Sequence, residues 1–223
     1  MLIVLTIIQS CSSNSESNNT QSLTQTPQAK IEHNQSNYGI YKGVFVGSSG
    51  IIILDINNSS TTISASLIID GNTLNFVSNQ TIQANQATTL NFVNGANSFT
   101  FSVAANGNNP TITNLLINGH PNAAILVVKE TSTTLVKCFE GSYSGGDLGT
   151  FNGVIYGNIL YGLIGNADTD IYTANGSVNN NQIEGSTQIG STISGTLNGN
   201  SCSGTWTNTQ AGINGTWSGI RTY

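Results

Sequence analysis

The sequence has little charge. Asp, Glu, Lys and Arg make up only 7% of its 223 residues, whereas about a quarter of an ordinary globular protein is charged. Five residues are Lys or Arg, and the net charge at pH 7 is −5. So few cations cannot form the basic patch that neutralises nucleic-acid phosphates. The composition therefore excludes DNA and RNA as partners.

Cysteine and histidine are also scarce. The three cysteines are Cys11, Cys138 and Cys202, and the two histidines are His33 and His120. No C-x-x-C pair occurs, and the histidines are not spaced as ligands of one metal ion, whereas a structural zinc site needs four ligands. The sequence therefore predicts neither a metal site nor a cofactor.

The sequence contains no motif that would assemble a catalytic centre. No Gly-x-Ser-x-Gly nucleophile elbow occurs, and His120 lies between Gly and Pro, a combination typical of a tight turn. The closest carboxylates, Asp168 and Asp170, are interpreted as a polar hairpin turn rather than as an acid–base pair or a calcium site. We therefore expect a protein without enzymatic activity.

What the sequence does contain is short runs of strand-forming residues. Hydrophobic residues reach 37%, and there are 25 glycines. From residue 38 onward, runs of alternating or β-branched residues such as "TISASLIID" and "SFTFSVAA" are separated by Gly, Asn or Asp. Their period is that of strands, and Asp-Gly and Asn-Gly dipeptides suit hairpin turns. The sequence therefore predicts an all-β fold, an antiparallel meander that forms a barrel or a sandwich.

Two halves of this region echo each other. "YKGVFVGSSG" begins at Tyr41 and "FEGSYSGGDLG" at Phe139, and both read aromatic–charged–Gly–x–aromatic–x–Gly. "IIDGNTL" from Ile68 is also similar to "VIYGNIL" from Val154. Chance similarity is the alternative in a chain so rich in Gly, Ser and Asn. We predict two related β modules, at residues 38–130 and 131–223.

The densest charge of the predicted fold lies where these modules meet. Lys129, Glu130, Lys137 and Glu140 fall close together in "KETSTTLVKCFE". They could form the rim of a binding site, or exposed ion pairs between neighbouring strands, each of which stabilises a protein by less than about 1 kcal/mol. We favour the structural interpretation.

The first ten residues contain an apolar block that ends at a cysteine. Residues 2–8 are apolar except for Thr6. This segment is too short to span a bilayer as a helix. "IIQSC" follows, and then a polar stretch. This pattern resembles a bacterial lipoprotein signal, which implies cleavage before Cys11 and lipid on that residue. No basic residue precedes Cys11, so we interpret residues 1–10 as a shortened signal peptide.

The resemblance to lipoproteins implies an address and an organisation for the chain. Residues 11–37 would form a flexible polar tether, and the lipid would hold the protein in the bacterial cell envelope, at the outer membrane. The alternative interpretation is that the opening stretch is a hydrophobic first strand of the fold and that Cys11 has no special role. An integral outer-membrane barrel is suggested by the terminal Tyr223, but most predicted strands are shorter than the 9–11 residues that such barrels need.

Cys138 and Cys202 leave two alternatives open. In an exported protein a pair of cysteines is expected to oxidise, and a bridge would tie an early strand of the second module to a late one. The other alternative is two buried thiols, which behave as small apolar groups.

The closing segment contains Gly-Thr-Trp twice, at Trp206 and Trp217, with Arg221 near the second. A Gly-x-Trp strand beside an Arg resembles small up-and-down ligand-binding barrels of the lipocalin type. Together with repeated Gly-x-aromatic-x-Gly, the terminal "GTWSGIR" also resembles Gly/Asn/Ser-rich β-lipoproteins of bacteria. The first resemblance implies a ligand site at Trp206, Trp217 and Arg221.

These observations lead to one main hypothesis and two alternatives. The main hypothesis is a lipid-anchored envelope protein whose β modules bind a partner or coat the surface without catalysis. The alternatives are a lipocalin-like barrel for a small ligand, and an adhesin that binds a glycan through exposed Asn, Thr, Tyr and Trp. The predicted partners are thus the membrane and a glycan or protein ligand.

Overall fold

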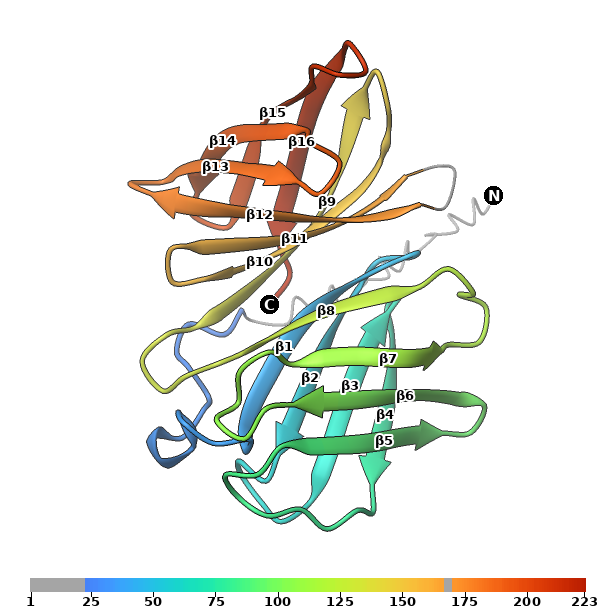
Figure 1. Cartoon of the computed structure of the whole chain (residues 1–223), viewed down its shortest axis with the longest axis vertical. Coiled ribbons are helices and arrows are strands. Elements are labelled where there is room, and N and C mark those ends of the chain that lie inside the picture. Colours follow the sequence, from blue (N-terminus) through green and yellow to red (C-terminus); the bar gives the residue numbers. More distant parts are fainter. Residues whose placement is uncertain (1–22, 167–169) are drawn as a thin grey trace, which may run out of the picture.

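The computed structural model describes residues 23–166 and 170–223 of the chain. It consists of two modules of eight antiparallel strands each, which lie side by side (Figure 1). A single turn of 3-10 helix, η1 (Ile31–His33), precedes the first strand. The prediction of an all-β antiparallel fold with two modules is therefore confirmed.

The strands of the first module are β1 (Gly39–Val46), β2 (Gly50–Ile56), β3 (Ile63–Ile69), β4 (Asn72–Ser78), β5 (Thr88–Asn94), β6 (Asn97–Val103), β7 (Thr111–Leu116) and β8 (Ala124–Lys129). Their order in the sheet is β7-β6-β5-β4-β3-β2-β1-β8, so that the sheet curls round but its two edge strands are not joined by a ladder. At the β3–β4 turn, Asp70 and Gly71 have φ of 48° and 75°. This is the left-handed pair expected from the Asp-Gly dipeptide.

The strands of the second module are β9 (Val136–Gly145), β10 (Gly149–Tyr156), β11 (Ile159–Asn166), β12 (Ile171–Asn179), β13 (Gln182–Thr187), β14 (Thr192–Asn198), β15 (Ser201–Asn208) and β16 (Ile213–Arg221). They form a closed barrel, because β16 pairs with β9. Alternate residues of each strand point into the barrel, and many of the inward positions are glycines that face each other across a pair of strands. Gly153 lies opposite Gly162, and Gly195 lies opposite Gly204.

One of the two sequence echoes marks equivalent positions of the modules. Gly43 lies in β1, which pairs with β2 and β8, and Gly141 lies in β9, which pairs with β10 and β16. A Cβ atom on either glycine would lie 1.9 Å from a carbonyl oxygen of the module's last strand, that of Leu126 or Ser218. The other pair of similar segments does not occupy equivalent positions. Ile68 precedes the turn between the third and fourth strands of its module, whereas Val154 precedes the turn between the second and third strands.

The modules share a small apolar junction. Val44, Val46 and Ile51 of the first module pack with Val136, Cys138, Val154 and Leu163 of the second. The buried Asn152 crosses this junction: its Nδ2 donates to the carbonyl of Phe45 at 2.6 Å, and its Oδ1 accepts from the amide of Gly141 at 3.0 Å. A satisfied polar group at this place fixes how the two surfaces meet.

The segment before β1 corrects the prediction of a flexible tether up to residue 37. From Thr24 on, this segment is bound to the modules, and we call residues 24–37 the strap. The strap amide of Gln28 donates to Glu130 Oε1 at 2.7 Å. Asn37 is fully buried, and its Nδ2 donates to Thr88 Oγ1 at 2.6 Å. The polar composition of this segment is like that of a spacer, but its backbone and side-chain polar groups form specific hydrogen bonds with the modules.

The charges at the junction also differ from the prediction of exposed ion pairs. Glu130 pairs with Lys42 of β1, with Nζ and Oε2 2.7 Å apart and both side chains fully buried. Glu130 Oε2 also accepts the amide of Val136 at 3.1 Å. Lys129 donates to the carbonyls of Ser36 and Tyr38. These charges therefore hold the strap and the modules together, and they do not form a rim.

Candidate functional site

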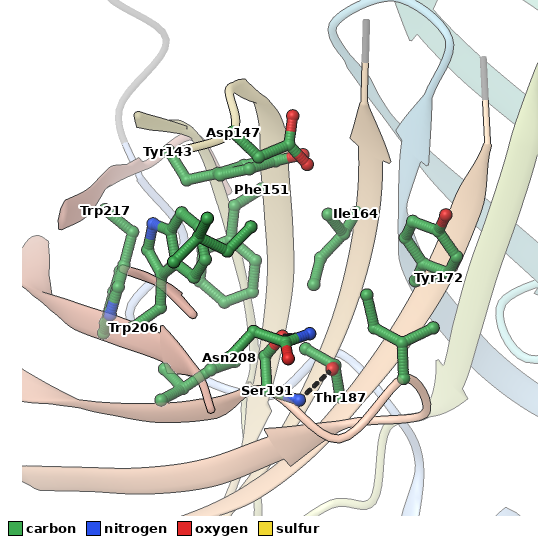
Figure 2. Close-up of a pocket in the computed structure, with 13 residues that line it drawn as sticks. Tyr143, Asp147, Phe151, Ile164, Tyr172, Thr187, Ser191, Trp206, Asn208 and Trp217 are labelled. Atoms are coloured by element: carbon green, nitrogen blue, oxygen red, sulfur yellow. Dashed lines mark hydrogen bonds between the residues drawn. The ribbon is translucent and has the colours of Figure 1, made fainter. Parts of the chain in front are cut away.

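The candidate site is a pocket at one end of the second barrel. The hairpins that join β9 to β10, β13 to β14 and β15 to β16 meet there, together with Ile164 of β11 and Tyr172 of β12. The cavity has a volume of about 70 Å³. This is below the roughly 300–1,000 Å³ of sites for drug-sized ligands, so the pocket suits only a small molecule. Figure 2 shows its lining, which consists of Tyr143, Asp147, Phe151, Ile164, Tyr172, Thr187, Ile189, Ser191, Ile193, Trp206, Asn208, Ile213 and Trp217.

Two tryptophans form the inner wall of this pocket (Figure 2). Trp206 of β15 and Trp217 of β16 are 8% and 4% exposed. The Trp206 indole N–H donates to the carbonyl of Ser144 at 3.2 Å, and that of Trp217 donates to the carbonyl of Thr205 at 3.1 Å. Because both indole donors are satisfied by backbone, the tryptophans present apolar ring surface to the pocket.

Further aromatic rings hold the tryptophans in place. Tyr143 meets Trp206 edge to face, with ring centroids 5.9 Å apart, and Phe151 meets Trp217 in the same way at 5.2 Å. Such pairs contribute about 0.5–1.5 kcal/mol beyond the area they bury. The result is a rigid aromatic wall contributed by four strands.

Inward glycines make room for these rings. A Cβ atom on Gly215 would lie 1.8 Å from the carbonyl oxygen of Ser144 and 2.6 Å from Trp206 Nε1. One on Gly195 would lie 2.4 Å from the carbonyl oxygen of Ser203 and 2.5 Å from Trp217 Cζ2. The ring therefore lies where a neighbouring side chain would otherwise stand. This explains why Gly and aromatic residues recur together in the second half of the sequence.

The polar groups of the pocket lie at its mouth. Asp147, in the β9–β10 hairpin, accepts the hydroxyl of Tyr143 at 3.1 Å and its neighbour's amide, that of Leu148, at 2.7 Å. Burial, followed by the nearby Asp147 carboxylate, raises the pKa of Tyr143 far above its usual value, so this hydroxyl stays protonated. Across the mouth, Asn208 Nδ2 donates to Ser191 Oγ at 3.2 Å.

The structure separates the three residues that the sequence placed in one site. Trp206 and Trp217 lie together in the pocket, but Arg221 lies four residues further along β16, at the opposite end of the barrel. Its Nε donates to the carbonyl of Tyr223 at 2.8 Å, and its Nη2 donates to the carbonyl of Thr24 in the strap. Arg221 therefore binds Thr24 of the strap and the C-terminal Tyr223 at the far side from the pocket.

The two cysteines of the second module are free thiols in the structure. Cys202 faces the barrel interior, whereas Cys138 belongs to the junction between the modules. They lie on opposite faces of the barrel wall, so the structure has the second of the two alternatives, buried thiols that pack as apolar groups. Cys11 lies outside the described residues, as does Asp168. Asp170 Oδ2 accepts the hydroxyl of Tyr172, a pocket residue, at 3.0 Å.

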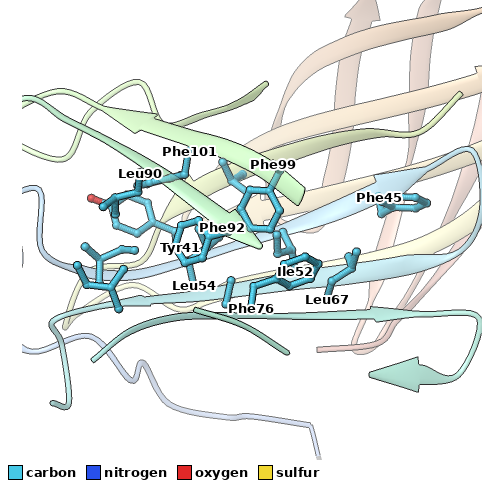
Figure 3. Close-up of a cluster of buried hydrophobic side chains, with 14 of the residues drawn as sticks. Tyr41, Phe45, Ile52, Leu54, Leu67, Phe76, Leu90, Phe92, Phe99 and Phe101 are labelled. Carbon is cyan, nitrogen blue, oxygen red and sulfur yellow. The ribbon is translucent and has the colours of Figure 1, made fainter. Parts of the chain in front are cut away.

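The interior of the first module is filled (Figure 3). Tyr41, Phe45, Phe76, Phe92 and Phe101 are all at most 1% exposed there, and Ile52, Leu54, Leu67 and Leu90 are fully buried. His120 is in a turn, as predicted, and its Nε2 lies 3.6 Å from Asp70 Oδ2. The pocket of the second barrel is thus the better candidate for a functional site.

Sequence reasoning missed Asp147 and Tyr143. Tyr143 is the second aromatic residue of the motif that begins at Phe139, and the motif could have marked it as a ring that faces a glycine. Within residues 23–166 and 170–223, no group of three or more His, Cys, Asp or Glu side chains could hold a metal ion. The same residues contain no helix long and apolar enough to cross a membrane.

Comparisons of the chain with models of protein families, with curated proteins and with solved structures gave no match.

Proposed function

We propose that this protein is a non-enzymatic binding protein whose second barrel takes a small, mainly apolar ligand into the aromatic pocket. The observation that carries this proposal is the position of the two tryptophans. The strands form a continuous closed sheet, and one end of the barrel contains a pocket lined by Trp206 and Trp217. The indole N–H groups of both are bonded to backbone. Ring surface without free donors favours an apolar body, and burial of such a body supplies the binding energy.

The position of the tryptophans favours this function over the alternatives. An adhesin that binds a glycan would present aromatic rings on an open face, where sugar rings can stack on them. Trp206 and Trp217 are instead buried inside the barrel, at the base of a pocket. A coat protein would need no such pocket. The small-ligand barrel, of the general type that the Gly-x-Trp pattern resembles, is therefore the function we favour.

The experiment uses a neutral probe, phenethyl alcohol, and the two tryptophans as reporters. Trp206 and Trp217 are the two Trp residues of the sequence, so their fluorescence reports on the pocket alone. We expect saturable quenching or enhancement, with calorimetry giving the same dissociation constant. Ile189, 44% exposed at the mouth, is replaced by Tyr to narrow the entrance, and the matched control is Ile220→Tyr, 66% exposed on the outer face.

We expect Ile189→Tyr to weaken the binding of phenethyl alcohol about tenfold or more, and Ile220→Tyr to leave it unchanged. Equal binding by both variants would place the probe outside the pocket. No binding of the probe to the parent protein would contradict the proposed function.

We also propose that Cys11 carries lipid and holds this binding module in the bacterial envelope, at the outer membrane. The support is the pattern of residues 1–12, which resembles a lipoprotein signal. The test is metabolic labelling with a fatty acid in cells that express the chain, with Cys11→Ala as the variant and Cys202→Ala as the control. Label that is lost only in Cys11→Ala supports the anchor, and label that is absent from the parent protein contradicts it.

A further inference from the structure

The mouth of the pocket contains a carboxylate whose hydrogen-bonding capacity is only partly used. Asp147 is half-buried and lines the pocket. Its Oδ1 accepts the amide of Leu148 and its Oδ2 accepts the hydroxyl of Tyr143. A carboxylate can accept about four hydrogen bonds, so each oxygen keeps a lone pair for a further donor. Figure 2 shows Asp147 and Tyr143 together on one side of the mouth, above Phe151.

The chain places none of its own cations beside Asp147. All five Lys and Arg residues lie in the described part of the chain. Lys42 is paired with Glu130, Lys129 is bound to the carbonyls of the strap, and Arg221 lies at the far end of the barrel. Lys137, the remaining one in the second module, precedes Tyr143 by six positions of β9, or roughly 20 Å along the strand. Lys30 belongs to the strap, where its amide donates to Asn58.

The two histidines do not reach the mouth either. His33 packs against Tyr38, with ring centroids 5.7 Å apart, and His120 lies beside Asp70. A second carboxylate, that of Asp170, accepts from the hydroxyl of Tyr172, which is itself a lining residue. Among the described residues that line the pocket, the charged one is Asp147, so the charge there is negative.

Aromatic rings surround the same space. The pocket is lined by Tyr143, Phe151, Tyr172, Trp206 and Trp217. Because these rings line the pocket, a ligand in it would contact ring atoms. A cation is attracted to the face of an aromatic ring, and most strongly to that of Trp. A negative rim above an aromatic wall is thus complementary to a molecule with a positive head and an apolar body.

We propose that the ligand is an organic cation, an ammonium group carried on an aromatic or branched aliphatic body. This inference rests on the proposed function of the pocket. The ammonium group lies at the mouth, where it donates to Asp147, and the body lies deeper, against Phe151, Trp206 and Ile193. The same charges exclude carboxylates, phosphates and sulfates, since no described cation could neutralise them there.

The test compares three molecules that share a phenyl ring and a chain of two carbon atoms, the second of which is the carboxylate carbon in the anion. These are phenethylamine, which is a cation at neutral pH, phenethyl alcohol, which is neutral, and phenylacetate, which is an anion. Dissociation constants are measured by tryptophan fluorescence and calorimetry at low and high salt. We expect phenethylamine to bind about tenfold more tightly than phenethyl alcohol at low salt, and phenylacetate more weakly than either.

The variant Asp147→Asn keeps the shape and removes the charge. We expect it to reduce the affinity for phenethylamine about tenfold and that for phenethyl alcohol by much less. The matched control, Glu184→Gln, removes an exposed carboxylate from β13 that accepts from Ser194, and it should change neither affinity. Thermal unfolding of each variant shows whether the fold is intact.

The outcomes separate the two levels of the proposal. Equal affinity for the amine and the alcohol, or an amine preference that survives Asp147→Asn, overturns the cationic ligand and leaves the pocket as a binding site. Tighter binding of phenylacetate also overturns it. If none of the three molecules binds, the proposed function fails together with this inference.

Discussion

The two modules arrange eight antiparallel strands in the same sequential order but fill their interiors differently. In the first module the inward positions carry Ile, Leu, Phe and Tyr, and its largest side chains are completely buried. In the second, many inward positions are glycines, and a few large rings occupy the space above them. The strand order thus determines the shell, and the volume of the inward side chains determines whether the shell is a solid scaffold or contains a pocket.

The two interiors also differ in how their stability arises. Each large aliphatic or aromatic side chain buried in the first module stabilises it by roughly 1.5–3 kcal/mol relative to an exposed one. The second module gives up part of this gain at its glycines, and ring packing of Trp206 and Trp217 replaces it. We expect the first module to be the more stable of the two, and the pocket to belong to the less stable one.

The largest expected effect concerns Glu130, which binds Lys42 of the first module, the amide of Val136 in the second and the amide of Gln28 in the strap. Glu130→Ala would leave Lys42 buried without its partner and the amides of Gln28 and Val136 without an acceptor. Loss of one partner of a buried ion pair costs about 3–5 kcal/mol. We expect calorimetry to show two separate unfolding transitions in place of one. The double variant Lys42→Met, Glu130→Leu should recover most of the stability, and a single unchanged transition in Glu130→Ala would show that the pair does not couple the modules.

A second prediction compares the solid interior with the pocket directly. Leu90→Ala removes a fully buried side chain of the first module, and we expect it to lower the free energy of unfolding by about 3 kcal/mol because it leaves a cavity. Ile213→Ala removes a half-buried side chain of the mouth, where solvent or ligand can fill the space, and about 1 kcal/mol is expected. Urea titration measures both. Equal losses would contradict the distinction between the two interiors.

A smaller effect is expected from a glycine under an aromatic ring. In Gly195→Ala the new methyl group would lie 2.4 Å from the carbonyl oxygen of Ser203 and 2.5 Å from Trp217 Cζ2. Both the neighbouring strand and the ring must therefore move, at about 1–3 kcal/mol for an overpacked site. The control is Gly153→Ala, whose nearest atom, Leu160 Cδ1, is 3.3 Å away and mobile. We expect an altered Trp fluorescence spectrum and weaker probe binding for Gly195→Ala alone. The same spectrum for both variants would show that the ring does not depend on this glycine.

The smallest expected effect concerns the two buried thiols, which serve as reporters of opening of the fold. Burial raises the pKa of Cys138 to about 12 and that of Cys202 to about 11, from an ordinary value of 9.0. Only the thiolate reacts with iodoacetamide, so neither should be modified at pH 8 in the native Cys11→Ala variant, and both should react in denaturant. Between pH 9 and 11 the folded chain retains protons that the unfolded chain loses, so stability falls as pH rises through this range.

Labelling at intermediate urea concentrations then separates the regions that the thiols report on. Cys202 reports on opening of the second barrel and Cys138 on separation of the junction. We expect Cys202 to react at the lower urea concentration. Reaction of both thiols at one concentration would show that the barrel and the junction open together.

The sequence alone was enough for the fold class and for part of the site. Alternation of apolar and polar residues, divided by Asp-Gly and Asn-Gly turns, is local information, and it predicted strands and two modules. Trp206 and Trp217 could be chosen because Gly-Thr-Trp repeats. Arg221 was grouped with them by its nearness in sequence, but four residues along a strand amount to roughly 13 Å, which carries it to the other end of a small barrel.

Other features depend on closure of the barrels and could not be read from local patterns. Asp147 becomes a pocket residue because the β9–β10 hairpin meets β15 and β16 only when β16 pairs with β9. Lys42 and Glu130 meet from opposite ends of the first module. The strap was mistaken for a spacer because composition does not show that Gln28 and Asn37 have buried partners.

The bond between Arg221 and the strap has a consequence for how the molecule is held. The strap reaches the second barrel at the end that Arg221 occupies, and the pocket opens at the other end. A force applied to the chain at Thr24 therefore acts on the end of the barrel opposite the pocket. The strap leaves the opening of the pocket unobstructed. Arg221 thus fastens the strap at the end of the barrel that lies away from the mouth.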